Sequence, residues 1–168
     1  MGRVGRLGGV AAPSIVPLAD RDLAFVREML YEAAFWRGTV DSPPIDEALS
    51  LPSLSIYLDG WGRPGDDGLV AKMGDEPAGA VWVRRFPDDA HGYGYVDELS
   101  IAVASDHRGR GIGRCLMTAI LAELRLQAIA QVSLSVEVDN PARRLYQSLG
   151  FVTWKAADGA STMRRTLQ

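Results

Sequence analysis

A segment rich in glycine and arginine, residues 108–113, is the part of the sequence best suited to binding an anion. Gly109, Gly111 and Gly113 alternate with Arg108, Arg110 and Ile112. An apolar, strand-like run precedes the segment and a helical pattern follows it. Glycine turns and the first turn of a helix expose backbone N–H groups, the helix dipole adds partial positive charge, and arginines add full charge. The segment therefore predicts a site for a pyrophosphate or a similar polyanion.

Two common phosphate-binding motifs do not fit these glycines. A P-loop needs Lys followed by Ser or Thr after its last glycine, and no Lys follows here. The dinucleotide fingerprint G-x-G-x-x-G needs a glycine three residues after Gly111, where the chain has Arg114. The pattern that fits is Arg-x-x-Gly-x-Gly, which is formed by Arg108, Gly111 and Gly113.

A second block, Asn140–Phe151, has the sequence NPARRLYQSLGF. Its Asn-Pro is a good helix start and its glycine a good helix stop, with Tyr146 between one and two turns into the helix. The two blocks together resemble the signatures of the GNAT superfamily of acyl-CoA-dependent N-acetyltransferases. The resemblance covers about Glu98–Phe151, is specific for fold and cofactor, and gives no information about the acceptor.

The resemblance implies an α/β (α+β) domain of the GNAT type, with a central mixed, mostly antiparallel twisted sheet of six to seven strands and about four flanking helices. Acetyl-CoA is the implied co-substrate, and no metal is implied. Residues 108–113 would hold the pyrophosphate, and the backbone of Ile101–Val103 would pair with the pantetheine arm as a further strand does. The implied cofactor-binding residues are Ile101, Ala102, Val103, Arg108, Gly109, Arg110, Gly111, Ile112, Gly113, Asn140 and Tyr146.

The resemblance also implies roles in acyl transfer from a thioester to an amine. Tyr146 would protonate the departing CoA thiolate, because a phenol pKa of about 10 is close to that of a thiol. The Val103 N–H would polarise the thioester carbonyl. The base is Glu98 or Asp97, and since strand residues alternate, at most one of them faces the cleft. The family favours Glu98, and a bulge would favour Asp97. A solvated carboxylate or a water chain is the alternative.

The predicted function is therefore N-acetyltransfer from acetyl-CoA to a primary amine of a small molecule or a peptide, by direct attack in a ternary complex. The alternative is a non-catalytic acyl-CoA-binding regulatory module. A third hypothesis, nucleic-acid binding through Arg108, Arg110 and Arg114, is disfavoured by a net charge of −3. A homodimer is an expectation from the family alone.

Composition predicts one globular domain over residues 13–168 behind a flexible tail over 1–12. The chain has 168 residues, of which 47% are apolar and 23% charged. Its single cysteine, Cys115, excludes an intrachain disulfide framework and favours the reducing cytoplasm. We interpret Cys115 as a small packing residue. No apolar run is long enough to cross a membrane.

The elements that must position these residues follow from periodicity and from turn signals. Helices are predicted after Asp20 or Asp22 to about 36–38, around 45–51, at 111–126 and at 140–150, with loops over 55–67 and 87–92. Strands are predicted at 15–18, 68–73, 78–86, 93–103, 131–138, 151–154 and 162–167.

Six further side chains have two possible interpretations each. Phe35, Trp36, Tyr57 and Trp61 are candidate acceptor contacts, although packing in the core is the better interpretation for any one of them. His91 and His107 lack metal-ligand spacing, so we expect both to be exposed loop residues.

Overall fold

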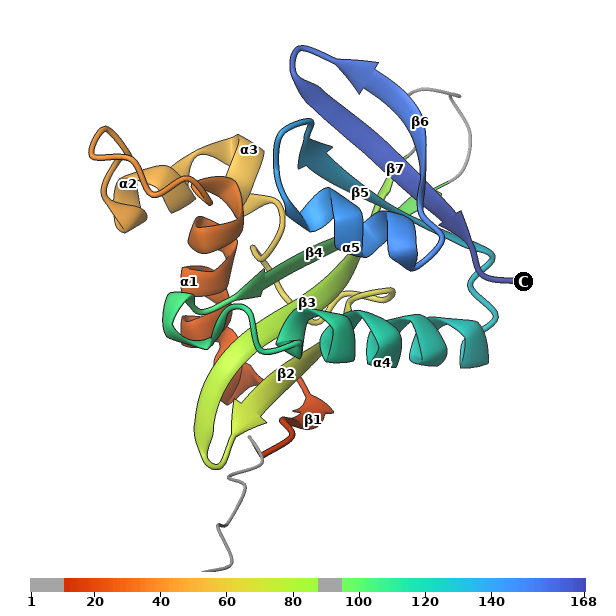
Figure 1. Cartoon of the computed structure of the whole chain (residues 1–168), viewed down its shortest axis with the longest axis horizontal. Helices are drawn as coiled ribbons and strands as arrows, with labels where there is room; N and C mark the ends of the chain where they lie inside the picture. The colour runs from red at the N-terminus through yellow and green to blue at the C-terminus, as the bar shows by residue number, and fades with distance from the viewer. Residues whose placement is uncertain (1–10, 88–94) are drawn as a thin grey trace, which may run out of the picture.

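A seven-stranded sheet with the strand order β1-β2-β3-β4-β5-β7-β6 forms the centre of the computed structural model, which describes residues 11–87 and 95–168 (Figure 1). Neighbouring strands are antiparallel, except that β4 and β5 run parallel. This is the mixed, mostly antiparallel sheet that the family resemblance implies. The strands are β1 (Ser14–Pro17), β2 (Asp67–Met73), β3 (Glu76–Pro87), β4 (Tyr95–Val103), β5 (Gln131–Glu137), β6 (Val152–Ala157) and β7 (Ala160–Thr166).

Two apolar cores form because successive side chains of a strand point to opposite faces of the sheet. On β3, Val81 and Val83 pack in the core beneath α4, while Ala80 and Trp82 pack in the core beneath α1. The two long helices therefore cover opposite faces (Figure 1). The helices are α1 (Leu23–Ala34), α2 (Ile45–Ser50), α3 (Pro52–Ser55), α4 (Ile112–Leu126) and α5 (Ala142–Ser148), with short 3₁₀ turns at Asp20–Asp22 and Ser105–His107.

The connection from β4 to α4 confirms the predicted strand, glycine loop and helix. Gly109 and Gly111 have φ angles of 73° and 80°, in the left-handed region that favours glycine. Gly111 is also the N-cap residue, directly before α4. The alternation of glycine with arginine therefore reflects what the backbone of this turn requires.

Some predicted boundaries and environments are wrong. The last hairpin is longer than expected, since β6 continues to Ala157 and β7 already begins at Ala160. Cys115 is exposed rather than packed, because it lies beside the buried stripe of α4 and not within it. Most of the predicted tail and of the loop over 87–92 lies outside the described residues. Within the described part of the chain, no helix combines the length and the apolar character that a membrane span requires.

Candidate active site

A cavity of about 510 Å³ lies between β4 and β5. The two strands pair at Glu98 and Ser133, and the residues that follow on each strand line the cavity. The rest of its wall comes from α1, α3, α4, α5 and β7 and from the segments next to them, which include Tyr57. Seven of the predicted cofactor-binding residues lie on this wall: Ile101, Ala102, Val103, Arg108, Gly113, Asn140 and Tyr146. The others, Gly109, Arg110, Gly111 and Ile112, occupy the intervening loop and the first position of α4, where Ile112 is buried in the core.

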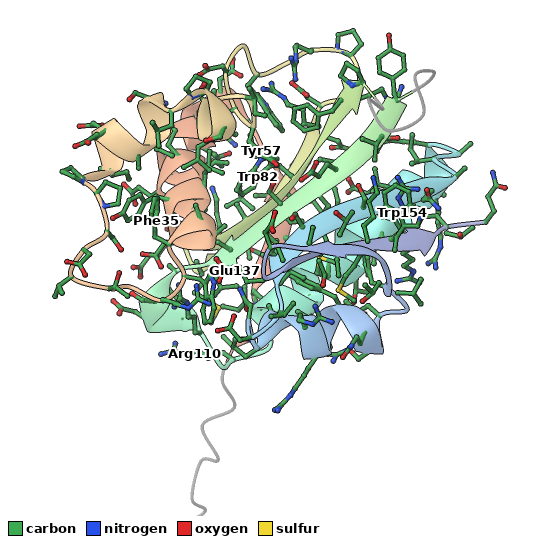
Figure 2. All side chains as sticks on the ribbon, turned by 90° about the horizontal axis from the view of Figure 1, so that it is seen from above. Phe35, Tyr57, Trp82, Arg110, Glu137 and Trp154 are labelled. Carbon is green, nitrogen blue, oxygen red and sulfur yellow. The ribbon has the colours of Figure 1, made fainter. Side chains whose placement is uncertain are left out.

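Arg108 is held by the protein itself. Its Nη2 atom lies 2.5 Å from Glu32 Oε2 on α1, and its Nε atom donates to the Val103 carbonyl at 3.1 Å. Glu32 therefore balances the positive charge of Arg108, which the sequence assigns to the anion site. Positive charge at the loop comes also from Arg110, which is exposed at its edge (Figure 2), and from Arg114, which donates to Ser148 Oγ at 2.9 Å.

We expect Gly111→Ala to lower the free energy of unfolding by about 1–2 kcal/mol, the usual difference for an L-residue in the left-handed region. A Cβ atom at Gly111 meets no described atom within 4 Å, so the penalty comes from the backbone and not from a clash. Gly113→Ala is the matched control, because its Cβ makes an ordinary 3.5 Å contact with Leu145 and its φ is not positive. Denaturant titration checks both variants, and equal stabilities would contradict the prediction.

Tyr146 reaches the cavity from α5 and is only 7% exposed. Burial raises the pKa of its phenol to about 12, so the hydroxyl stays protonated at any ordinary pH. The ring lies against Phe151, with 6.1 Å between the ring centroids. Asn140 lies two residues before the same helix, and its Oδ1 atom accepts a hydrogen bond from the N–H of Ala142, the first helical residue, at 2.9 Å. The NH₂ group of Asn140 is therefore the part of its side chain that can donate to a ligand.

The structure distinguishes the two carboxylates near the start of β4. Glu98 lines the cavity and accepts a 2.9 Å hydrogen bond from the Tyr57 hydroxyl. Burial raises the pKa of Glu98, and this hydrogen bond lowers it in part. Asp97 is paired with Arg85 on β3, through bonds of 2.8 and 3.2 Å. The pairing of Gly79–Pro87 with Tyr95–Val103 shows no register shift, so the bulge that would favour Asp97 is not present in these strands.

Two of the four candidate aromatic residues, Trp36 and Tyr57, line the cavity. Phe35 instead lies against Tyr31, with ring centroids 4.8 Å apart, and Trp61 lies under the guanidinium of Arg84 at 5.6 Å. Both therefore match the packing interpretation.

Of the two histidines, His91 lies outside the described residues. The expectation that His107 is exposed is wrong. Its side chain is 12% exposed, because the 3₁₀ turn after β4 carries it toward Glu76, whose Oε1 atom is 3.8 Å from Nε2.

A polar bridge that sequence reasoning missed joins the end of α1 to the end of β5. The Trp36 indole N–H donates to Glu137 at 3.1 Å, and Arg37 contacts both Glu137 and Asp139. Trp36 and Glu137 also line the cavity, so the bridge forms part of its wall. These partners are about a hundred residues apart, and no local sequence signal connects them.

Comparison with known proteins gives a consistent result. The model of the acetyltransferase (GNAT) family matches residues 27–151. The chain is 40% identical over 150 residues to a mycothiol acetyltransferase of Actinosynnema mirum, a match that covers 88% of this chain and 46% of that enzyme. It is 47% identical over 88 residues to a mycothiol acetyltransferase of Thermobispora bispora, covering 51% of this chain and 30% of that enzyme. The chain thus matches less than half the length of these relatives.

Solved structures share the fold at low sequence identity. The PaiA N-acetyltransferase of Thermoplasma acidophilum, in complex with coenzyme A, superposes with a TM-score of 0.72 at 17% identity, covering 93% of this chain and 99% of that one. A ribosomal-protein-alanine N-acetyltransferase of Brucella melitensis gives a TM-score of 0.68 at 22% identity, covering 91% of this chain and 99% of that one.

Proposed function

Because the chain belongs to the acetyltransferase (GNAT) family, we propose that it transfers the acetyl group of acetyl-CoA to a primary amine by direct attack in a ternary complex. The observation that carries the proposal is the cavity between β4 and β5, which is lined by both Glu98 and Tyr146. A carboxylate and a phenol are the groups that an amine and a thiolate need for proton transfer. Their presence favours turnover over the alternative of a non-catalytic binding module.

The glycine loop fits the pyrophosphate of acetyl-CoA. No side chain of the described residues caps α4, so the N–H groups of its first turn are left for an anion. The left-handed glycines add further backbone N–H groups, and Arg110 and Arg114 add charge. When bound, acetyl-CoA supplies an activated acetyl thioester.

Each residue then has one task in the proposed reaction. The backbone of Ile101–Val103 binds the pantetheine arm, with Asn140 donating to it from the other side of the cavity. The Val103 N–H donates to the thioester carbonyl and stabilises the charge that develops on its oxygen. Glu98 accepts a proton from the attacking amine, and Tyr146 donates a proton to the departing sulfur.

We expect Glu98→Gln to lower kcat/KM roughly 10²-fold at neutral pH, the lower end for loss of a general base, because a water chain can carry the proton instead. The base acts only when ionised, and burial places its pKa above the ordinary value. In the unchanged protein kcat/KM therefore falls as the pH drops through this raised pKa. The variant lacks this acidic limb, and a pH–rate series checks the result. A limb that persists in the variant would assign the base elsewhere.

The experiment that tests the function is acetyl-CoA consumption, read as free thiol, over a panel of amines. The panel holds polyamines, aminoglycosides, amino acids, short peptides and the acceptor of the mycothiol acetyltransferases. Release of thiol with one class identifies the acceptor. A shift in melting temperature with acetyl-CoA but no thiol release from any amine would favour the binding module, and no shift at all would overturn the assignment of the glycine loop.

The setting of this reaction is also a proposal. We propose that residues 13–168 form a single catalytic domain that works in the cytoplasm, and that this domain forms a homodimer, as the family leads us to expect. The single cysteine supports a reducing compartment. The acidic net charge of −3 supports an acceptor other than nucleic acid.

A further inference from the structure

The segment between α3 and β2 carries Tyr57 to the cavity wall, where its hydroxyl bonds Glu98 Oε1 at 2.9 Å. Most of this segment consists of turns without regular secondary structure. A side chain on such a segment holds a partner in a fixed place only if the backbone around it is itself fixed. The contacts of Arg84 on β3 supply that fixation.

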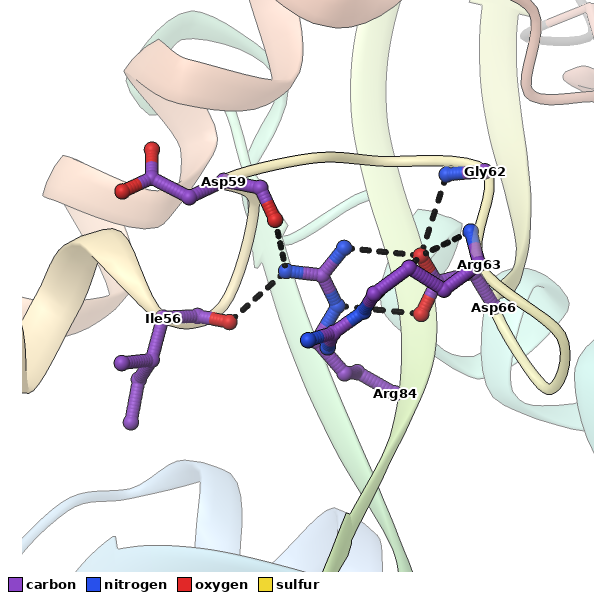
Figure 3. A network of polar contacts seen from close by, with 6 residues as sticks. All are labelled: Ile56, Asp59, Gly62, Arg63, Asp66 and Arg84. Atoms are coloured by element: carbon purple, nitrogen blue, oxygen red, sulfur yellow. Dashed lines mark hydrogen bonds and ion pairs between the residues drawn. The ribbon is translucent and has the colours of Figure 1, made fainter.

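Arg84 is fully buried, and its guanidinium binds the segment at both ends (Figure 3). Its Nη1 atom donates to the Ile56 carbonyl at 2.7 Å and to the Asp59 carbonyl at 2.8 Å. Its Nε and Nη2 atoms donate to the two carboxylate oxygens of Asp66 at 3.0 and 2.7 Å. Tyr57 follows Ile56 directly, so the anchored carbonyl belongs to the peptide group that leads into Tyr57.

Asp66 fixes the far end of the same segment. Its Oδ2 atom also accepts hydrogen bonds from the backbone N–H groups of Gly62 and Arg63, each at 3.0 Å (Figure 3). The carboxylate is therefore surrounded by donors from the segment on one side and from Arg84 on the other. The segment is attached to β3 through a buried, paired charge.

The sheet register places this anchor beside the cavity. Arg84 on β3 lies directly opposite Glu98 on β4, and paired residues of antiparallel strands point to the same face. The Tyr57 ring is held a second time by Phe86, edge to face, with 5.4 Å between the ring centroids. Arg84 and Phe86 are two residues apart on β3 and therefore point to the same face of the sheet. One strand thus supports both the backbone of the segment and the ring of Tyr57.

We infer that Tyr57 is a positioning residue, which holds the Glu98 carboxylate in one orientation on the cavity wall, and that Arg84 and Asp66 fix the segment that carries it. The inference rests on the proposed function, in which Glu98 is the base. The bond uses one carboxylate oxygen, and the second oxygen has lone pairs of its own with which to accept a proton from an amine. Positioning of this kind lets the base act without a search through rotamers.

The ionisation of the two groups is consistent with this role. Burial raises the pKa of Tyr57, and the neighbouring Glu98 carboxylate raises it further, so the hydroxyl remains a donor. Burial raises the pKa of Glu98, and the bond from Tyr57 acts in the opposite direction. The other ionisable groups around them are Arg84, balanced by Asp66; Arg108, balanced by Glu32; Glu137, contacted by Arg37; and Tyr146.

The test is Tyr57→Phe, which keeps the ring and removes the hydroxyl. The pKa of Glu98 is followed by carbon-13 NMR of the glutamate carboxylates, with Glu98→Gln identifying the signal, and kcat/KM is followed against pH. We expect both the Glu98 titration and the acidic limb of kcat/KM to move up by about one pH unit, because the bond to the charged form is lost. The KM for acetyl-CoA should stay unchanged.

Tyr31→Phe is the matched control. The Tyr31 hydroxyl also donates a partly buried hydrogen bond, but its acceptor is the Pro43 carbonyl, at 2.7 Å, and not Glu98. Both variants lose one hydroxyl, so a change in stability alone does not separate them. Only Tyr57→Phe should move the Glu98 titration.

The outcomes separate the inference from the function on which it rests. A Glu98 titration that is the same in Tyr57→Phe and in the unchanged protein overturns the positioning role, whatever the activity. If the Glu98 titration moves in Tyr57→Phe but Glu98→Gln leaves the pH–rate profile unaltered, the hydrogen bond between the two residues is supported. Glu98 is then not the base, and the role of Tyr57 in positioning a base is overturned. A titration and an acidic limb that move together support the inference.

Discussion

Tyr146→Phe is expected to lower kcat about 10²- to 10⁴-fold, the range for loss of a general acid, with little change in the KM for acetyl-CoA. The phenol acts on the sulfur only as it departs, so its loss affects the transition state more than the bound ground state. The ring remains, and with it the packing against Phe151. Steady-state kinetics with the acceptor found in the amine panel check the result.

The pKa of Tyr146, raised to about 12 by burial, is consistent with this acid role. A thiolate that forms in the same cavity is also desolvated, and desolvation raises the pKa of a thiol in the same direction. The difference in pKa between the phenol and the thiol is therefore smaller than the raised phenol pKa alone indicates. The acid form of Tyr146 is fully populated at working pH, so no alkaline limb from this group is expected below about pH 10.

Tyr95→Phe is the control for Tyr146→Phe. Tyr95 is at the start of β4, with its side chain exposed, and does not line the cavity. We expect its kinetics to match those of the unchanged protein. A Tyr146→Phe protein that unfolds at the same temperature and keeps full turnover would remove the phenol from the mechanism and leave the departing thiolate to be protonated by water.

The glycine loop could be predicted from the sequence because its requirement is local. Left-handed φ angles at Gly109 and Gly111 follow from the turn itself, and no distant residue is needed to explain them. Period-two alternation likewise limits Glu98 and Asp97 to opposite faces. Which face borders the cavity depends on how β3 and β5 pair with β4, and that is not a local property.

Contacts between distant segments could not be predicted. The sequence assigns the charge of Arg108 to the anion site and gives no sign of a protein partner, but α1 brings Glu32 to it from 76 residues away. The bridge from Trp36 to Glu137 spans 101 residues. The packing prediction for Cys115 is wrong for a related reason, since the rotation of α4 about its axis is set by the sheet on which it packs. Each of these depends on how whole elements dock.

Arg84→Met is expected to lower the free energy of unfolding by about 3–5 kcal/mol, the range measured when one partner of a buried ion pair is removed. Met keeps much of the apolar stem, so the loss is mainly electrostatic. Asp66, 2% exposed, would be left without its guanidinium, and the Ile56 and Asp59 carbonyls would lose a donor. Chemical denaturation followed by tryptophan fluorescence measures the change.

The effect of Arg84→Met should depend on pH. Burial raises the pKa of Asp66, but its hydrogen bonds with Arg84 and the Arg63 N–H outweigh this, and the net pKa is lowered. A group whose pKa is lowered in the folded state stabilises that state above its unfolded pKa, and this stabilisation is lost as the pH falls through the lowered value. The difference between the two proteins is therefore greatest at neutral pH and shrinks below about pH 4.

Arg63→Met also removes an arginine that contacts Asp66, but this arginine is exposed at the surface. Comparing the two variants therefore separates the effect of burial from the effect of losing a positive charge. Arg63 is 49% exposed and its Nε atom lies 3.9 Å from Asp66, so we expect a loss of at most about 1 kcal/mol. The double variant Arg84→Met/Asp66→Leu should recover part of the stability lost in Arg84→Met, because no charge is then buried alone. If Arg84→Met were no worse than Arg63→Met, the Arg84–Asp66 pair would not be what holds the Tyr57 segment. The segment would then have to be fixed by the packing of Tyr57 on Phe86 alone.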